Sequence, residues 1–237
     1  MGDRTVGILS YDHSPPVPGA CGSGLNRAII CIWVVLVMAC FGVLMSYGQR
    51  AGEIGTPCSA SDAGIGIDGE RFTLVMSIHP KCACSDSSMY ELERLVERCN
   101  GGVRCVFVVY EPDGQPMGWY QDERRVLLAR FPNARVLSDR DGLLASRLGA
   151  VTSGSTVLYS PSGAAVFWGG ITPRRAHAGD NLGSDSIAAL VCGLPPVRKQ
   201  TLVFGCPITD LGAHGLLGSC GIEQNALAVA GSEERTQ

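Results

Sequence analysis

The sequence of 237 residues predicts an α/β fold, with a central mixed sheet flanked by helices, behind one membrane-spanning helix. Three observations predict this. From Phe72 onward, strand-like and helix-like segments alternate, the order that builds parallel strand pairs. The run 72–78 is almost entirely apolar, as in a strand that is covered on both faces. The uncharged run 28–48 is long enough to cross a hydrocarbon core of about 30 Å.

The run 28–48 is longer than a signal-peptide core of roughly 7–15 residues, so an uncleaved anchor is favoured over a cleaved signal. Residues 1–27 are rich in Pro, Gly and Ser and are expected to form a disordered tail. Arg4 and Arg27 precede the span and Arg50 follows it. This positive-inside bias predicts a single-pass protein of the cell inner membrane, with a cytoplasmic N-terminus and a periplasmic or other extracytoplasmic domain.

The overall composition is that of a globular protein. The chain is 46% hydrophobic and carries a formal net charge of −3, which gives no indication of nucleic-acid binding. Of eleven cysteines, Cys21, Cys31 and Cys40 lie before or within the apolar run, which leaves eight beyond it. An even number permits, but does not require, disulfide pairing in an oxidising compartment.

The segment 72–95 reads as a strand, a short turn and an amphipathic helix. Pro80 ends the strand, and Ser85 or Ser88 can cap the helix. Ser88 and Glu91 have the spacing of a capping box, in which each side chain satisfies a free backbone N–H. The apolar face of this helix is formed by Met89, Leu92, Leu95, Val96 and Cys99.

Cys82 and Cys84 lie in the turn before that helix. A helix N-terminus favours a thiolate over a thiol, and Lys81 acts in the same direction while Asp86 opposes it. Two cysteines one residue apart can form a disulfide only if the residue between them is turned, because their Cα atoms must lie within about 4.4–6.8 Å. Such a small ring is strained and easily reduced. The pair therefore indicates a redox or metal-binding site, against the alternative of two buried thiols or separate structural disulfides.

The rest of the chain continues the alternation. Residues 49–70 are expected to be a linker, 71–208 the folded domain, and 209–237 a flexible extension. The predicted elements that follow the first helix are a strand 103–110, a helix 119–131, a strand 134–137, a helix 142–148, a β-hairpin 155–168 and a helix 185–194.

The order of these elements resembles the thioredoxin fold. Five motifs extend the likeness: the chain resembles a small group of membrane-anchored thioredoxin-like proteins labelled RedB. These motifs are HPKCACS (79–85), VTSGSTVLYSPSG (151–163), FWGGIT (167–172), HAGDN (177–181) and FGCPI (204–208). The resemblance implies a thioredoxin-like domain at a membrane, and its implications for activity are less specific.

Two positions depart from the thioredoxin pattern. The usual cysteine pair is CxxC, whereas this chain has CxC. An alignment with thioredoxins without a gap places Lys81 at the position of the nucleophilic cysteine and Cys84 at that of the second cysteine. An alignment with a one-residue deletion places Cys82 at the position of the nucleophile. We expect Cys82 to be the nucleophile and Cys84 the resolving thiol. Where thioredoxins have a cis-proline facing the cysteines, this chain has Ser155 before Thr156. A non-proline cis peptide costs about 2.5–4 kcal/mol, so a trans peptide is expected and thioredoxin-like peptide docking is in question.

Four further residues are candidates for a supporting role. His79 can activate a thiol or bind a metal, or else simply end the strand. His177 and Asp180 lie in a loop that can return near the cysteines, although a turn stabilised by Asp180 explains them as well. Cys206 is either a partner of the CxC pair or half of a structural disulfide. Cys99, Cys105 and Cys192 are expected to be small core residues, and Arg174 and Arg175 a solvated patch.

Three classes of function follow. The first is a membrane-anchored thiol–disulfide oxidoreductase, without cofactor, that exchanges with thiol- or disulfide-containing proteins or membrane redox partners. The second is a metal-binding protein or chaperone, in which Cys82, Cys84 and His177 hold copper. The third is a non-catalytic thioredoxin-like interaction domain with a structural disulfide. No nucleic-acid partner is expected.

Overall fold

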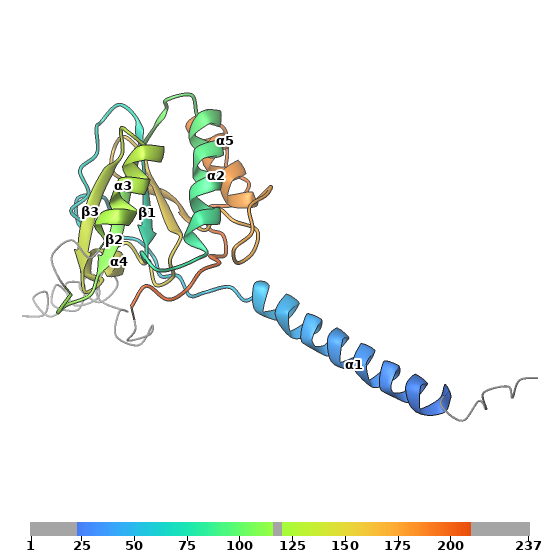
Figure 1. Cartoon of the computed structure of the whole chain (residues 1–237). Coiled ribbons are helices and arrows are strands. Elements are labelled where there is room, and N and C mark those ends of the chain that lie inside the picture. The colour runs from blue at the N-terminus through green and yellow to red at the C-terminus, as the bar shows by residue number, and fades with distance from the viewer. Residues whose placement is uncertain (1–22, 116–119, 210–237) are drawn as a thin grey trace, which may run out of the picture. The chain divides into compact units, whose positions relative to one another are not determined.

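The structure, a computed structural model, describes residues 23–115 and 120–209 (Figure 1). Most of the expected N-terminal tail and C-terminal extension lies outside these residues. The elements are α1 (Ser23–Gly48), β1 (Phe72–Ile78), α2 (Ser85–Arg98), β2 (Val103–Glu111), α3 (Gln121–Arg130), β3 (Arg135–Arg140), α4 (Leu143–Arg147), β4 (Ser155–Tyr159), β5 (Ala165–Gly169) and α5 (Leu182–Val191).

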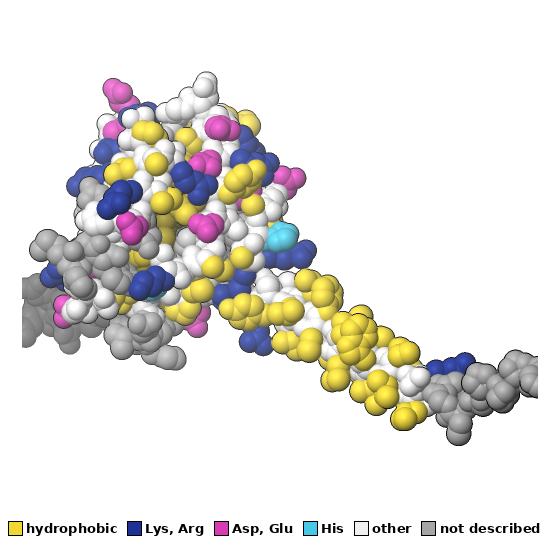
Figure 2. All heavy atoms as spheres, in the orientation of Figure 1, with side chains coloured by type: hydrophobic (Ala, Val, Ile, Leu, Met, Phe, Trp, Pro, Cys, Tyr) yellow, Lys and Arg dark blue, Asp and Glu magenta, His cyan; other side chains and the backbone are white. Residues whose placement is uncertain are grey.

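Most of the helix α1 belongs to a first unit, which ends at Met45, and the second unit begins at Ser46 and includes the last residues of the helix. Residues Gly24–Gly48 contain an 18-residue stretch with a mean hydropathy of 2.9 and are long and apolar enough to cross a membrane, as an anchor or a signal sequence would be. Figure 2 shows hydrophobic side chains along the whole of α1. The face of the second unit in view carries acidic and basic side chains interspersed, which is typical of a solvated surface.

One mixed five-stranded sheet with the order β3-β2-β1-β4-β5 forms the centre of the second unit. The three strands β1, β2 and β3 are parallel, whereas β4 runs antiparallel to β1 and β5 antiparallel to β4. Side chains of β1 alternate between two cores, as the pleat requires. Leu74 and Met76 pack with α2, α3 and α5 on one face, and Val75 packs with α4 and the segment 58–65 on the other. This is a thioredoxin-like fold, as predicted.

Two helix starts differ from the sequence prediction. The helix α2 has Cys84 at its N-cap position and no side-chain cap, so the capping box between Ser88 and Glu91 is not formed. Both residues instead lie inside the helix and are buried. The helix α5 is capped by Asn181, whose Oδ1 accepts the Ser184 N–H at 2.8 Å, and it starts earlier than the expected cap at Ser184 or Asp185.

Two segments without regular structure are attached to the sheet. The expected linker 49–70 packs on the domain: Cys58 is disulfide-bonded and buried, and the Gly52 N–H donates to Val203 O at 2.8 Å. The segment 199–208 runs past β5 and continues beside the residues that lead into β4, because Trp168 N–H donates to Lys199 O and Ile208 N–H to Val151 O. This second segment carries Cys206.

Candidate functional site

Cys82 and Cys84 lie where β1 leads into α2. The Cys82 N–H donates to His79 O at 3.0 Å, and the Ser85 N–H donates to Cys82 O at 3.0 Å, which closes a tight turn around Ala83. Both cysteines therefore directly precede the free N–H groups of a long helix, where negative charge is favoured. The turn is the local geometry that a CxC pair needs in order to bring its two cysteines together.

A third thiol completes the cluster. The Sγ atoms of Cys82, Cys84 and Cys206 all lie within 4.8 Å of one another, and all three cysteines are reduced. Cys206 is fixed by its backbone, since the Ser153 N–H donates to Cys206 O at 2.8 Å. The structure thus brings Cys206 to the CxC pair, in line with one of the two roles expected for it, and we call these three residues the thiol cluster.

Within the thiol cluster, Cys82 is the residue that favours a thiolate. Its burial by itself would raise its pKa, but the backbone N–H and the thiol of Cys206 donate hydrogen bonds to it. The Cys84 N–H and the Ser153 hydroxyl add two more, so that the pKa of Cys82 lies below its ordinary value. A lowered pKa increases the fraction present as thiolate, which is the nucleophile in disulfide exchange.

The other two thiols have raised pKa values and therefore favour the protonated form. Burial and then the negative charge of Cys82 raise the pKa of Cys84, and burial together with hydrogen bonding to Cys82 raises the pKa of Cys206 to about 11. Two groups from one loop oppose this rise. The Ala176 N–H donates to Cys84, and the Arg175 guanidinium lowers the pKa of both thiols. Arg175 was expected to be solvated, and this expectation was wrong: the side chain is half-buried, and its Nε donates to Arg50 O at 3.0 Å.

The backbone of Ala176 is strained. Its φ of 51° places a non-glycine residue in the left-handed region, which is uncommon and unfavourable for a residue with a Cβ. In this conformation the Ala176 N–H points at Cys84 and donates a hydrogen bond to it. The strain therefore coincides with a contact to the thiol cluster.

Glu91 holds the loop 173–181 against α2. Its carboxylate is only 3% exposed and accepts the Gly179 N–H at 2.8 Å, the Asn181 side-chain amide at 3.4 Å and the Arg94 guanidinium at 3.1 Å. A buried carboxylate requires such partners, because burying an unpaired charge is costly. Glu91 thus fixes the loop that carries Arg175 and Ala176.

Ser153 joins the strand end to the thiol cluster. Its hydroxyl accepts the His79 N–H at 2.9 Å and lies 3.2 Å from the Ser85 hydroxyl. It also donates to Cys82, as described above. The His79 ring stacks on Tyr110 at 5.5 Å, and its Nδ1 accepts the Lys81 N–H at 3.1 Å. His79 is thus engaged locally at the end of the strand.

The remaining predicted residues lie as follows. Ser155 begins β4 and donates its hydroxyl to Thr152 O at 2.6 Å, and Thr156 donates to Gly154 O at 3.2 Å. None of the described residues has a cis peptide, in agreement with the trans peptide expected at Ser155. His177 and Asp180 are exposed and are not members of the thiol cluster.

Three other cysteines were expected in the core. Cys99 and Cys105 are buried, and burial raises their pKa values to about 11 and about 12. For Cys192 the expectation was wrong, since it is exposed just after α5. These three thiols provide an internal comparison for the reactivity of the thiol cluster.

A cleft of about 400 Å³ opens beside Cys82. It lies between α2 and α3, and its apolar lining comes from Ile78, Met89, Val109, Val126 and Leu127. Lys81, Asp86 and Asp122 add charged groups to the lining. The cleft can receive an apolar group next to Cys82, although the cysteine itself is only 6% exposed.

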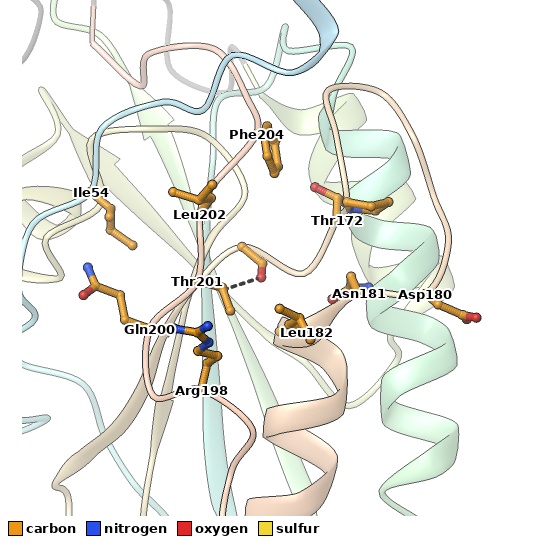
Figure 3. Close-up of a pocket in the computed structure, with 13 residues that line it drawn as sticks. Ile54, Thr172, Asp180, Asn181, Leu182, Arg198, Gln200, Thr201, Leu202 and Phe204 are labelled. Carbon is orange, nitrogen blue, oxygen red and sulfur yellow. Dashed lines mark hydrogen bonds between the residues drawn. The ribbon is translucent and has the colours of Figure 1, made fainter.

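A second cavity, of about 690 Å³, lies where the segment 198–204 passes the start of α5. Figure 3 shows Ile54, Leu202 and Phe204 on its lining, and the hydrogen bond from Thr201 Oγ1 to Gly170 O at 2.8 Å. The residues of the thiol cluster do not line this cavity. It is therefore separate from the site described above.

Sequence reasoning missed Ser153, Arg175, Ala176 and the role of Glu91. A basic residue beside the HAGDN motif was the one available signal, and it was interpreted as a solvated patch. Ser153 acts through its hydroxyl, Ala176 through its backbone N–H, and Glu91 through a carboxylate that contacts a loop far along the chain. No local pattern exists for such contacts.

No protein-family model and no curated protein matches the chain. Among solved structures, a hypothetical protein of Sinorhizobium meliloti is 19% identical, with a TM-score of 0.50, over 68% of this chain and 92% of its own. An uncharacterized conserved protein of Geobacillus kaustophilus is 20% identical, with a TM-score of 0.50, over 68% and 90%. These two likenesses support the fold. A secreted disulfide oxidoreductase of Mycobacterium tuberculosis is 16% identical, with a TM-score of 0.40, over 63% and 98%.

Proposed function

We propose that this chain is a membrane-anchored thioredoxin-like thiol–disulfide oxidoreductase in which Cys82 is the attacking thiol and Cys84 the resolving thiol. The observation that carries the proposal is the contrast within the thiol cluster: one thiol with a lowered pKa lies beside two thiols with raised pKa values, all within 4.8 Å. A nucleophile next to proton-bearing thiols is the arrangement that disulfide exchange requires.

The exchange proceeds in two steps. The Cys82 thiolate attacks one sulfur of a substrate disulfide, forms a mixed disulfide, and releases the other substrate sulfur as a thiolate. Cys84 then loses its proton and attacks Cys82 Sγ, which forms the Cys82–Cys84 disulfide and releases the second substrate sulfur. The substrate gains two electrons and the protein loses two, and the reverse sequence oxidises a substrate dithiol.

Three features assist these steps. The cleft beside Cys82 accommodates an apolar group of the substrate. The turn closed by the Ser85 N–H and Cys82 O supports ring closure with Cys84. The Ala176 N–H and the Arg175 charge stabilise the Cys84 thiolate during the second step. The helix α1 would hold the domain at the extracytoplasmic face of a membrane, near membrane-bound redox partners.

The test is disulfide exchange with a fluorescent glutathione disulfide by the full chain in detergent. We expect Cys82→Ser to abolish exchange, Cys84→Ser to accumulate a mixed disulfide at Cys82 detectable by mass mapping, and Cys99→Ser to behave as wild type. The Cys82–Cys84 couple should titrate above about −300 mV, the range of labile disulfides. Full activity of Cys82→Ser would refute the proposal, and a Cys82–Cys206 disulfide in the wild type would transfer the resolving role to Cys206.

The orientation at the membrane is tested separately. A membrane-impermeant maleimide applied to intact cells whose outer barrier has been opened should label Cys192, the exposed cysteine of the described domain. Labelling only after the inner membrane is lysed would place the domain in the cytoplasm.

A further inference from the structure

We infer that the reduced thiol cluster is also a binding site for one soft monovalent cation, with Cu(I) held by Cys82, Cys84 and Cys206. This site goes beyond disulfide exchange, since it binds an ion with all three thiols and leaves their oxidation state unchanged. Exchange as proposed above needs only two of them.

The donor set is the first argument. The cluster offers three sulfur ligands within 4.8 Å of one another, with no fourth histidine, cysteine or carboxylate grouped with them in the described part of the chain. Thiolate ligands select soft ions such as Cu(I) and Zn²⁺. Structural zinc sites are almost always four-coordinate, so a set of three thiolates fits Cu(I) better.

The spacing of the sulfurs is the second argument. Three sulfurs at about 2.3 Å from a central ion, in a trigonal plane, are about 4.0 Å apart. The largest separation here is at most 4.8 Å, so the cluster needs to contract by no more than about 0.8 Å per pair. Because Ser153 holds the Cys206 backbone, a contraction of this size is made by rotation of the cysteine side chains.

The surroundings of the thiol cluster are the third argument. Three thiolates and one monovalent cation leave a net charge of −2. The donors that face this charge are the backbone N–H groups of Cys84, Ala176 and Cys206 and the guanidinium of Arg175. The cluster also lies at the N-terminus of α2, whose dipole favours an anionic site.

This ligand set differs from the one that the sequence suggested as an alternative. His177 was the expected third ligand, but it is exposed and lies outside the thiol cluster, and Cys206 takes its place. Ion binding and disulfide formation exclude one another, since a Cys82–Cys84 disulfide removes two of the three donors. Only the dithiol form of the protein binds the ion.

The experiment is an anaerobic titration of the full chain in detergent with Cu(I), in competition with a chromogenic Cu(I) chelator and after reduction by a phosphine. We expect one Cu(I) per reduced chain and none on the oxidised form. Cys206→Ser should weaken binding by at least about tenfold, the smallest loss expected for a metal site that loses a supporting group. Cys192→Ser, which removes an exposed cysteine outside the cluster, should bind as the wild type does.

X-ray absorption on the copper-loaded wild type gives a readout that does not depend on the folding of any variant. Three sulfur neighbours around one copper support the inference, and two sulfurs or the absence of a stoichiometric ion overturn it. The same preparations are assayed for disulfide exchange before any copper is added. Failure to bind copper with exchange intact overturns this inference alone, whereas copper binding without exchange overturns the oxidoreductase proposal alone.

Discussion

Gly205 controls how closely Cys206 approaches the other two thiols. A Cβ added at Gly205 would lie 2.0 Å from Ser153 O, a backbone atom that no rotamer change can move away. Because Cβ contacts below 3.0 Å are essentially never observed, Gly205→Ala must push the two segments apart by about 1 Å. The Ser153 N–H to Cys206 O hydrogen bond, now 2.8 Å long, would be broken by a shift of that size.

Two consequences follow from Gly205→Ala. Overpacking costs about 1–3 kcal/mol and the lost hydrogen bond about 0.5–1.5 kcal/mol, so the free energy of unfolding should fall by about 1.5–4.5 kcal/mol. Cys82 also loses both hydrogen bonds that Cys206 donates to it, so its pKa should rise toward the ordinary value. Its alkylation by iodoacetamide should therefore require a higher pH than in the wild type.

The assay is mass-resolved alkylation of Cys82 across pH, together with urea unfolding, on the full chain in detergent. The control is Gly66→Ala, where the nearest atom to the new Cβ is the end of a flexible arginine side chain at 3.5 Å. That variant should change stability by less than about 0.5 kcal/mol. If Gly205→Ala unfolds at the lower urea concentration but leaves the pH profile of Cys82 unchanged, Cys206 does not tune this thiol.

Two further predictions concern the loop that faces the thiols. Arg175→Gln removes a positive charge that lowers the pKa of Cys84. Alkylation of Cys84 should therefore slow at neutral pH and keep its rate at high pH. An unchanged dependence of the alkylation rate on pH would show that the charge is screened. Glu91→Gln leaves the Gly179 N–H with a neutral acceptor and should lower the free energy of unfolding by about 1.5–3 kcal/mol and slow Cys84 alkylation. The control is Glu93→Gln, on the same helix, whose ion-pair partner Arg130 is partly exposed. This variant should lower the free energy of unfolding by at most about 1 kcal/mol and leave the alkylation rate of Cys84 unchanged. Equal effects of the two variants on Cys84 alkylation would contradict the role given to the loop.

The strands and the CxC turn could be predicted because their signals are local. An apolar run such as 72–78 marks a buried strand by itself, and the two cysteines follow it directly in the sequence. The prediction of a capping box was wrong because the contact that decides the position of Glu91 is not local. Ser88 and Glu91 have the correct spacing, but Glu91 makes its hydrogen bond to Gly179, a residue 88 positions away.

Contacts between distant segments also explain why other residues of the loop 173–181 were proposed. His177 and Asp180 were proposed because they lie in a loop that can return near the cysteines. The loop instead presents the backbone amide of Ala176, which any residue type except proline would carry. A sequence pattern cannot reveal a backbone donor whose direction depends on a positive φ and on an anchor in another helix.

The hydrogen bond from Arg175 Nε to Arg50 O means that the residues just after α1 also support the loop that faces the thiol cluster. A protease or a processing enzyme that cuts before Arg50 would separate the domain from α1 with this bond intact. A cut a few residues later would remove the acceptor of Arg175, and also the Gly52 N–H that holds Val203, three residues before Cys206. A shortened chain that starts beyond Gly52 would thus keep every cysteine of the thiol cluster and still lose part of the scaffold that places two of them.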